Sequence, residues 1–130
     1  MSLSLADVRA TVAVTDITRA KAFYEEQLGL VPLDPNAGPI QMYACGSSRL
    51  QVYESPEHAG KATATVASWS VGDHDAVVDA LISRGVRFDR HDALPCAARG
   101  VHAFGTHRVA WCSDPDGNVL AVDNGQSGGM

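Results

Sequence analysis

Residues 12–30 read VAVTDITRAKAFYEEQLGL, and residues 69–86 read WSVGDHDAVVDALISRGV. Both stretches run in the same order, from an apolar strand through an aspartate that caps a helix to an amphipathic helix that a glycine ends. The capping Asp16 aligns with Asp73, and the terminal glycines align as well. A repeat near half the chain length indicates two copies of one supersecondary unit. Two such units usually bury a shared face, so the functional site is sought there.

The first half of the chain is predicted to form a strand, a helix and a hairpin. Apolar and polar residues alternate over 8–15, which is typical of a half-buried strand. Residues 17–28 carry apolar side chains at helical spacing. A turn-rich loop follows over 34–39, and then IQMYACG and SSRLQVYE form a hairpin around Gly46 and Ser47.

The second half repeats this pattern with one irregular stretch. Its expected elements are a linker over 55–61, a strand over 63–71, a helix over 74–84, a strand that begins at 86, an irregular segment over 89–105, and a final hairpin of strands 107–112 and 118–123. The sequence DPDG joins the last two strands and suits a type I turn. By this pattern, each half is a βαβββ module with its helix on one side of its sheet and a concave surface on the other.

Length and composition are those of one globular domain. The chain has 130 residues, 45% of them hydrophobic, and a net charge of −5. We expect a single domain over 1–130, with module one at about 6–55, module two at about 62–124 and a disordered tail over 125–130. The negative charge argues against nucleic acid as a partner, and no apolar run is long enough to span a membrane.

Cysteine usage points to a reducing compartment. Cys45, Cys96 and Cys112 are odd in number and widely spaced, without a CxxC pair. We therefore expect free thiols in a cytoplasmic protein, and the N-terminal residues carry no secretory signal pattern.

The paired strand–Asp–helix–Gly units, FYEEQLGL and the terminal SDPDGNVLAVDN together resemble the vicinal oxygen chelate superfamily. That superfamily includes glyoxalase I, extradiol dioxygenases, fosfomycin-resistance enzymes and bleomycin-resistance proteins. The resemblance covers about residues 6–124. It implies an α+β fold of two βαβββ modules that curl into a cup-shaped mixed sheet, with the helices on the outer face. It also implies a homodimer, in which same-chain and swapped pairing of modules both stay open.

In this family, four strand positions supply His, Gln or Glu ligands to a metal that acts as a Lewis acid. The resemblance places these positions at Arg9, Gln51, Val66 and Ala121. Arginine has no lone pair to donate, and valine and alanine side chains have no donor atom. A single glutamine is not a metal site, because catalytic sites need about three protein ligands. We therefore expect no metal and no cofactor in the cup.

The cup remains the predicted binding pocket, although no catalytic residue can be assigned in it. Its expected lining residues are Arg9, Met42, Gln51, Tyr53, Val66, Ser68, Ala110, Cys112 and Ala121. Strand alternation predicts that Ala110, Cys112 and Ala121 share the cup side, with Trp69 and Trp111 on the helix side. Arg9 is expected to hold an anionic group.

Each of these assignments has an alternative. Arg9 also fits a structural ion pair, Gln51 and Tyr53 fit packing between modules, and Cys112 fits a nucleophile less well than a buried apolar residue. A displaced metal site built from His91, His102 and His107 is a minor alternative to solvated histidines. The segment 89–105 fits a mobile lid over the pocket or an oligomer contact.

Three functions are consistent with these features. The leading prediction is a metal-independent protein that sequesters a small molecule, which resembles the bleomycin-resistance branch. The second is a glyoxalase-like lyase, isomerase or dioxygenase that uses a displaced metal or metal-free acid–base chemistry, a reading that rests on fold analogy. The third is a structural or regulatory dimer without a ligand.

Overall fold

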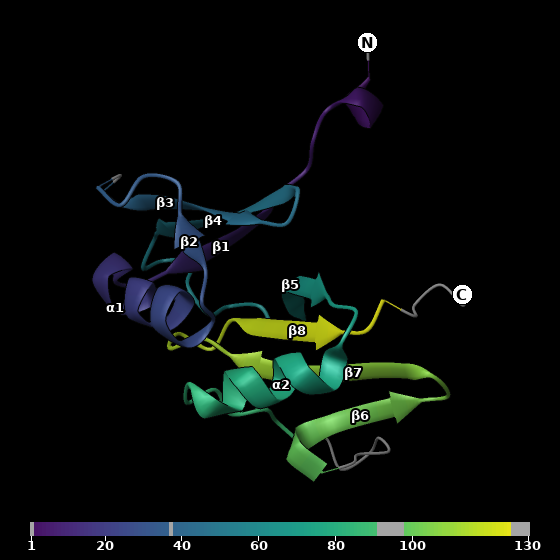
Figure 1. Cartoon of the computed structure of the whole chain (residues 1–130). Helices are drawn as coiled ribbons and strands as arrows, with labels where there is room; N and C mark the ends of the chain where they lie inside the picture. The colour runs from purple at the N-terminus through teal and green to yellow at the C-terminus, as the bar shows by residue number, and fades with distance from the viewer. Residues whose placement is uncertain (1, 37, 91–97, 126–130) are drawn as a thin grey trace.

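The structure, a computed structural model, describes residues 2–36, 38–90 and 98–125 (Figure 1). Module one comprises β1 (Ala10–Val14), α1 (Ile17–Lys21), the π-helical segment η2 (Ala22–Gln27), β2 (Val31–Pro32), β3 (Ile40–Cys45) and β4 (Ser48–Glu54). Module two comprises β5 (Thr65–Ser70), α2 (His74–Ser83), β6 (Val101–Phe104), β7 (His107–Ser113) and β8 (Val119–Asp123). Short 3-10 helices lie at Leu3–Leu5 and Ala98–Gly100. The predicted disordered tail falls almost wholly outside the described residues.

The two sheets share one topology. Their strand orders are β1-β4-β3-β2 and β5-β8-β7-β6, so the second sheet repeats the first. In each sheet the strand that comes first in the chain pairs in parallel with the one that comes last, β1 with β4 and β5 with β8. The remaining pairs are antiparallel. β1 and β5 lie in contact where the modules meet. The predicted α+β fold of two βαβββ modules is therefore confirmed.

The helix caps form as predicted, but the first helix is not a single α-helix. Asp16 accepts hydrogen bonds from the amides of Thr18 and Arg19, and Asp73 caps α2 in the same way. From Ala22 onward the first helix becomes a π-helix, in which the Leu28 amide bonds to the Phe23 carbonyl five residues back. The wider turn places the adjacent rings of Phe23 and Tyr24 in the core together, 5.1 Å apart.

Module two departs from the predicted strand positions. The strand expected from residue 86 is reduced to one bridge, where the Asp89 amide donates to the Trp111 carbonyl at 2.7 Å. β6 instead lies inside the segment predicted to be irregular. Gly100 permits this, because it has φ +80° and a Cβ at that position would lie 2.9 Å from the Phe88 carbonyl oxygen. The alternation of apolar and polar residues in the sequence does not reveal a packing constraint of this kind.

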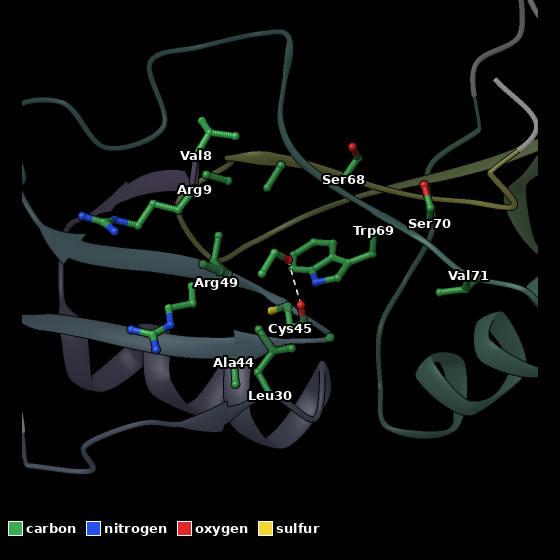
Figure 2. A pocket seen from close by; sticks show the side chains of 15 residues that line it. Val8, Arg9, Leu30, Ala44, Cys45, Arg49, Ser68, Trp69, Ser70 and Val71 are labelled. Atoms are coloured by element: carbon green, nitrogen blue, oxygen red, sulfur yellow. Dashed lines mark hydrogen bonds between the residues drawn. The ribbon is translucent and has the colours of Figure 1, made fainter. Parts of the chain in front are cut away.

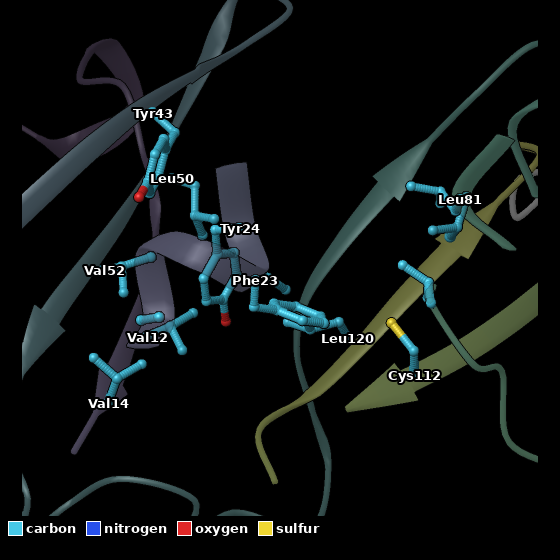
Figure 3. Close-up of a cluster of buried hydrophobic side chains, with 14 residues drawn as sticks. Val12, Val14, Phe23, Tyr24, Tyr43, Leu50, Val52, Leu81, Cys112 and Leu120 are labelled. Carbon is cyan, nitrogen blue, oxygen red and sulfur yellow. The ribbon is translucent and has the colours of Figure 1, made fainter. Parts of the chain in front are cut away.

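One hydrophobic cluster runs through both modules on the helix side of the sheets (Figure 3). Helix residues Ala20, Phe23 and Leu81 meet strand residues from both sheets in it. The buried members are Val12, Val14, Ala20, Phe23, Tyr24, Tyr43, Leu50, Val52, Ala67, Leu81, Val86, Cys112, Leu120 and Val122. The core is therefore shared between the modules. We call the opposite face of each sheet, away from the helices, the cup face.

The DPDGN turn of module two is built into module one. The buried Asp114 carboxylate accepts hydrogen bonds from the Tyr24 hydroxyl at 2.7 Å and from the Asn118 side chain at 2.8 Å. The Asn118 amide also donates to the Ala13 carbonyl at 2.8 Å, and its oxygen accepts from the Gly60 amide. Residues 58 to 105 positions apart in the chain therefore satisfy each other's buried polar groups.

Asp116 adds a second connection at the same turn. Its carboxylate accepts a hydrogen bond from the Thr15 amide at 3.0 Å and pairs with Arg19 at 2.6 Å. Gly60 lies directly against this turn, since a Cβ there would lie 2.0 Å from the Asp116 carbonyl oxygen. The linker between the modules therefore needs glycine at this point.

Among the described residues, no helix is both long enough and apolar enough to cross a membrane.

We predict that Asn118→Ala lowers the free energy of unfolding by about 2–4 kcal/mol, because it leaves the buried Ala13 carbonyl and Asp114 carboxylate short of donors. Chemical denaturation followed by circular dichroism measures this change. Asn36→Ala is the matched control, because Asn36 is exposed and should change stability by less than about 0.5 kcal/mol. Equal effects of the two substitutions would show that the turn does not couple the modules.

Candidate functional site

On module one, the predicted pocket residues share the cup face. Met42 lies opposite Gln51 in the β3–β4 pair, and Tyr53 follows on the same side of β4. Arg9, just before β1, reaches this face as well, since its Nε donates to the Gln51 Oε1 at 3.2 Å. The structure therefore brings Arg9, Met42, Gln51 and Tyr53 together as predicted.

On module two, the predicted facing of β7 is wrong. Ala121 lies opposite Trp111 and beside Ser68, so these three residues share the cup face. Cys112 lies opposite Leu120 and packs in the shared core, and Ala110 packs against Val78 of α2. The observed register differs from the expected one by one residue, which moves every β7 side chain to the other face. Cys112 and Ala110 therefore lie on the helix side and Trp111 on the cup side.

The prediction for Trp69 holds, but that for Val66 does not. Trp69 packs against the shared core on the helix side. The β5–β8 pairing skips Val66, because Thr65 pairs with Val119 and Ala67 pairs with Leu120. This irregularity turns Val66 toward the core and gives the cup position to Thr65, whose hydroxyl accepts a hydrogen bond from the Trp111 indole at 3.2 Å.

The residues at the four family positions do not fit a metal. The Arg9 guanidinium is already a donor to Gln51, and Ala121 contributes no polar atom. Thr65 or Val66 at the remaining position adds at most one neutral hydroxyl. Across the described part of the chain, no group of three His, Cys, Asp or Glu side chains comes together in a way that could hold a metal.

Two of the three histidines considered for a displaced metal site lie on the cup face. His102 is fully buried on the cup face of β6, with its ring 5.2 Å from the Trp111 ring, and His107 lies on the same face. His91, the third member of the displaced metal site considered above, lies outside the described residues, as do residues 91–97 of the proposed lid. His74, at the start of α2, is buried and hydrogen-bonded to the Val122 carbonyl at 2.9 Å.

Three buried ionisable side chains on the helix side, two tyrosines and a cysteine, are held in their neutral forms. Burial, with the neighbouring Asp114 carboxylate, raises the pKa of Tyr24 far above its ordinary value. Burial and a hydrogen bond to Glu25 raise the pKa of Tyr43. Burial, together with the charges of Asp89 and Asp114, raises the pKa of Cys112 to about 12. These groups stabilise the core and are poor nucleophiles or acids at neutral pH.

A hollow of about 580 Å³ lies where the β3–β4 hairpin approaches β5 (Figure 2). Arg9 and Arg49 border it at one end, and Trp69 lies in its wall. Arg49 was not among the predicted site residues. Its position two residues before Gln51 on one strand was the available signal, because residues at that spacing share a face.

We predict that iodoacetamide modifies Cys112 at pH 8 at least a hundredfold more slowly in the native protein than in the unfolded protein. With a pKa of about 12, only about one thiol in ten thousand is ionised at pH 8. Peptide mapping by mass spectrometry measures the rate at each cysteine, and the half-buried Cys45 serves as the internal reference. Rapid native labelling of Cys112 would return it to the list of candidate nucleophiles.

Comparison with known proteins agrees with this architecture. The sequence profile described as "Glyoxalase/Bleomycin resistance protein/Dioxygenase superfamily" matches residues 8–122. No curated protein matches the chain. Among solved structures, the chain is similar to a glyoxalase/bleomycin resistance protein from Catenulispora acidiphila, with 30% identity, a TM-score of 0.68, and coverage of 90% of this chain and 96% of that one.

Two further structures extend the comparison. TnmS3, an antibiotic binding protein from Streptomyces sp. CB03234, is 25% identical with a TM-score of 0.69, covering 94% of this chain and 98% of that one. A lactoylglutathione lyase from Agrobacterium tumefaciens is 21% identical with a TM-score of 0.66, covering 97% and 98%, and shares the fold. The chain therefore belongs to the glyoxalase/bleomycin resistance/dioxygenase superfamily, also called the vicinal oxygen chelate superfamily, as a member without the usual metal ligands.

Proposed function

We propose that this protein binds a small anionic molecule on its cup face, without a metal and without changing the molecule chemically. The observation that carries the proposal is the contact between Arg9 and Gln51 at the family's ligand positions. A guanidinium repels a metal ion and attracts an anion, so charge recognition takes the place of metal coordination.

The rest of the cup face supports binding rather than catalysis. Ser68 and Ala121 are small and leave room above the second sheet, while Trp111 offers an aromatic surface beside them. Cys112 lies on the other side of the sheet with its pKa raised, so it offers no nucleophile to the cup. TnmS3, which shares this fold at 25% identity, is an antibiotic binding protein, and that description supports small-molecule binding here.

A lyase, isomerase or dioxygenase of the glyoxalase type is the second candidate. One observation favours it, namely that the imidazole of His102 lies on the cup face next to Trp111. An imidazole in a pocket can act as a general acid or base at neutral pH. The two candidates differ in whether the ligand is recovered unchanged after incubation with the protein.

We also propose a cytoplasmic homodimer. The N-terminal segment projects from the body of the chain, with Leu3, Leu5 and Val8 exposed by 87%, 95% and 88% (Figure 1). Apolar side chains this exposed favour burial against a second copy. Three widely spaced cysteines are consistent with a reducing compartment.

We predict that protein purified without chelators contains less than about one-tenth of an equivalent of transition metal, and that an anionic ligand found by thermal-shift screening raises its melting temperature. Elemental analysis and a screen of acidic metabolites and antibiotics measure these outcomes. Arg9→Ala should abolish the shift, whereas Arg87→Ala, the same change at an exposed arginine of module two, should preserve it. Stoichiometric metal would contradict the proposed function.

We predict that the same ligand changes the fluorescence of Trp111 more than that of Trp69, because Trp111 lies on the cup face, whereas Trp69 packs against the shared core and only its edge lies in the wall of the hollow. Single substitutions separate the two signals. Trp111→Phe should remove most of the ligand-induced change, and Trp69→Phe should retain most of it. The opposite pattern would place the ligand on the helix side of the sheets and exclude the cup face as the site.

A further inference from the structure

Arg9 and Arg49 lie side by side on the cup face of module one. β1 and β4 are parallel, with Ala10 paired to Leu50, so the residues immediately before that pair are neighbours. Adjacent strands are about 4.8 Å apart, so the side chains of Arg9 and Arg49 start close enough together for both to reach one ligand group. Figure 2 shows both guanidinium groups extending to the same side, away from Trp69.

No carboxylate among the described residues pairs with either arginine. Arg9 donates to the neutral amide of Gln51, and the Arg49 side chain has no hydrogen bond or ion pair to another described residue. Arg19 and Arg99, in contrast, are each paired with aspartates in the same chain. Two adjacent cations without an ion pair repel each other, in a protein whose net charge is −5.

We propose that Arg9 and Arg49 together bind one doubly charged oxyanion, inorganic phosphate or the phosphate group of a phosphate monoester. This inference rests on the proposed function and specifies its ligand class. A dianion neutralises both guanidinium charges. Its several oxygens can accept hydrogen bonds from the paired N–H groups of both arginines at once. A monocarboxylate has two oxygens and one charge, so it satisfies one arginine and leaves the other unpaired.

The surroundings fit a group of this size. A hollow of about 660 Å³ borders the two arginines on the side of the N-terminal segment, and Ser47 and Ser48 line it, together with Asp7, whose carboxylate pairs with neither arginine. The Ser48 hydroxyl donates to the Cys45 carbonyl at 2.7 Å, which fixes the hairpin beside the arginines (Figure 2). Gln51 holds the Arg9 side chain over the sheet, so its orientation is set before a ligand arrives.

Isothermal titration calorimetry of the full chain at pH 8 and low salt tests the proposal, with inorganic phosphate and acetate as probes. We expect one phosphate per chain, with acetate at least tenfold weaker. Arg49→Gln and Arg9→Gln should each weaken phosphate binding at least tenfold. Arg49→Lys keeps the charge without the fork and should give a smaller loss. Arg87→Gln, an exposed arginine elsewhere, should leave the affinity unchanged.

Other results would overturn the inference. These are no measurable phosphate binding by the wild type, equal affinity for acetate, or an equal loss in Arg49→Gln and Arg87→Gln. Circular dichroism establishes that each variant is folded. If a ligand from the thermal-shift screen still stabilises Arg49→Gln as it does the wild type, the diarginine site is wrong and the proposed function stands. If no ligand stabilises the wild type, the proposed function fails separately.

Discussion

The buried carboxylate of Asp114 is the constraint on which the arrangement of the two modules depends. An isolated carboxylate in an apolar core would be costly, and this one is satisfied by Tyr24 from module one and by Asn118 from its own turn. Asn118 in turn saturates the Ala13 carbonyl of β1. The modules therefore cannot separate unless these polar groups lose their hydrogen-bond partners. This requirement fixes the position of β1 relative to β5, and with it the cup that both sheets form.

Local sequence patterns were sufficient to predict the scaffold. The caps at Asp16 and Asp73 and the glycines after each helix are short-range features, and the structure contains them as predicted. The π-helical segment and β6 were not predictable in this way. The first depends on the adjacent rings of Phe23 and Tyr24 entering a core made by distant strands. The second depends on the close approach of Gly100 to Phe88.

The facing of the candidate residues was predicted correctly in module one and wrongly at several positions of module two, for a physical reason. In module one the tight turn at Gly46 fixes the register of β3 and β4, so alternation alone gives the facing of Met42 and Gln51. In module two the pairing skips Val66, and a five-residue connection places Ser113 opposite Val119. A shift of one residue exchanges the two faces of a strand. Val66 and Trp111 were consequently assigned to the wrong side.

The corrected facing makes the two halves of the cup chemically different. Module one presents cations and amides through Arg9, Arg49 and Gln51, whereas module two presents Trp111, His102 and small side chains. A symmetric metal site needs similar donors from both halves, and these halves no longer supply them. In the proposed function, this asymmetry distinguishes the two ends of a ligand, because charge is stabilised at one sheet and apolar surface at the other. The scaffold is the same in both halves, whereas the side chains that face the cup differ, and the proposed oriented binding rests on that difference.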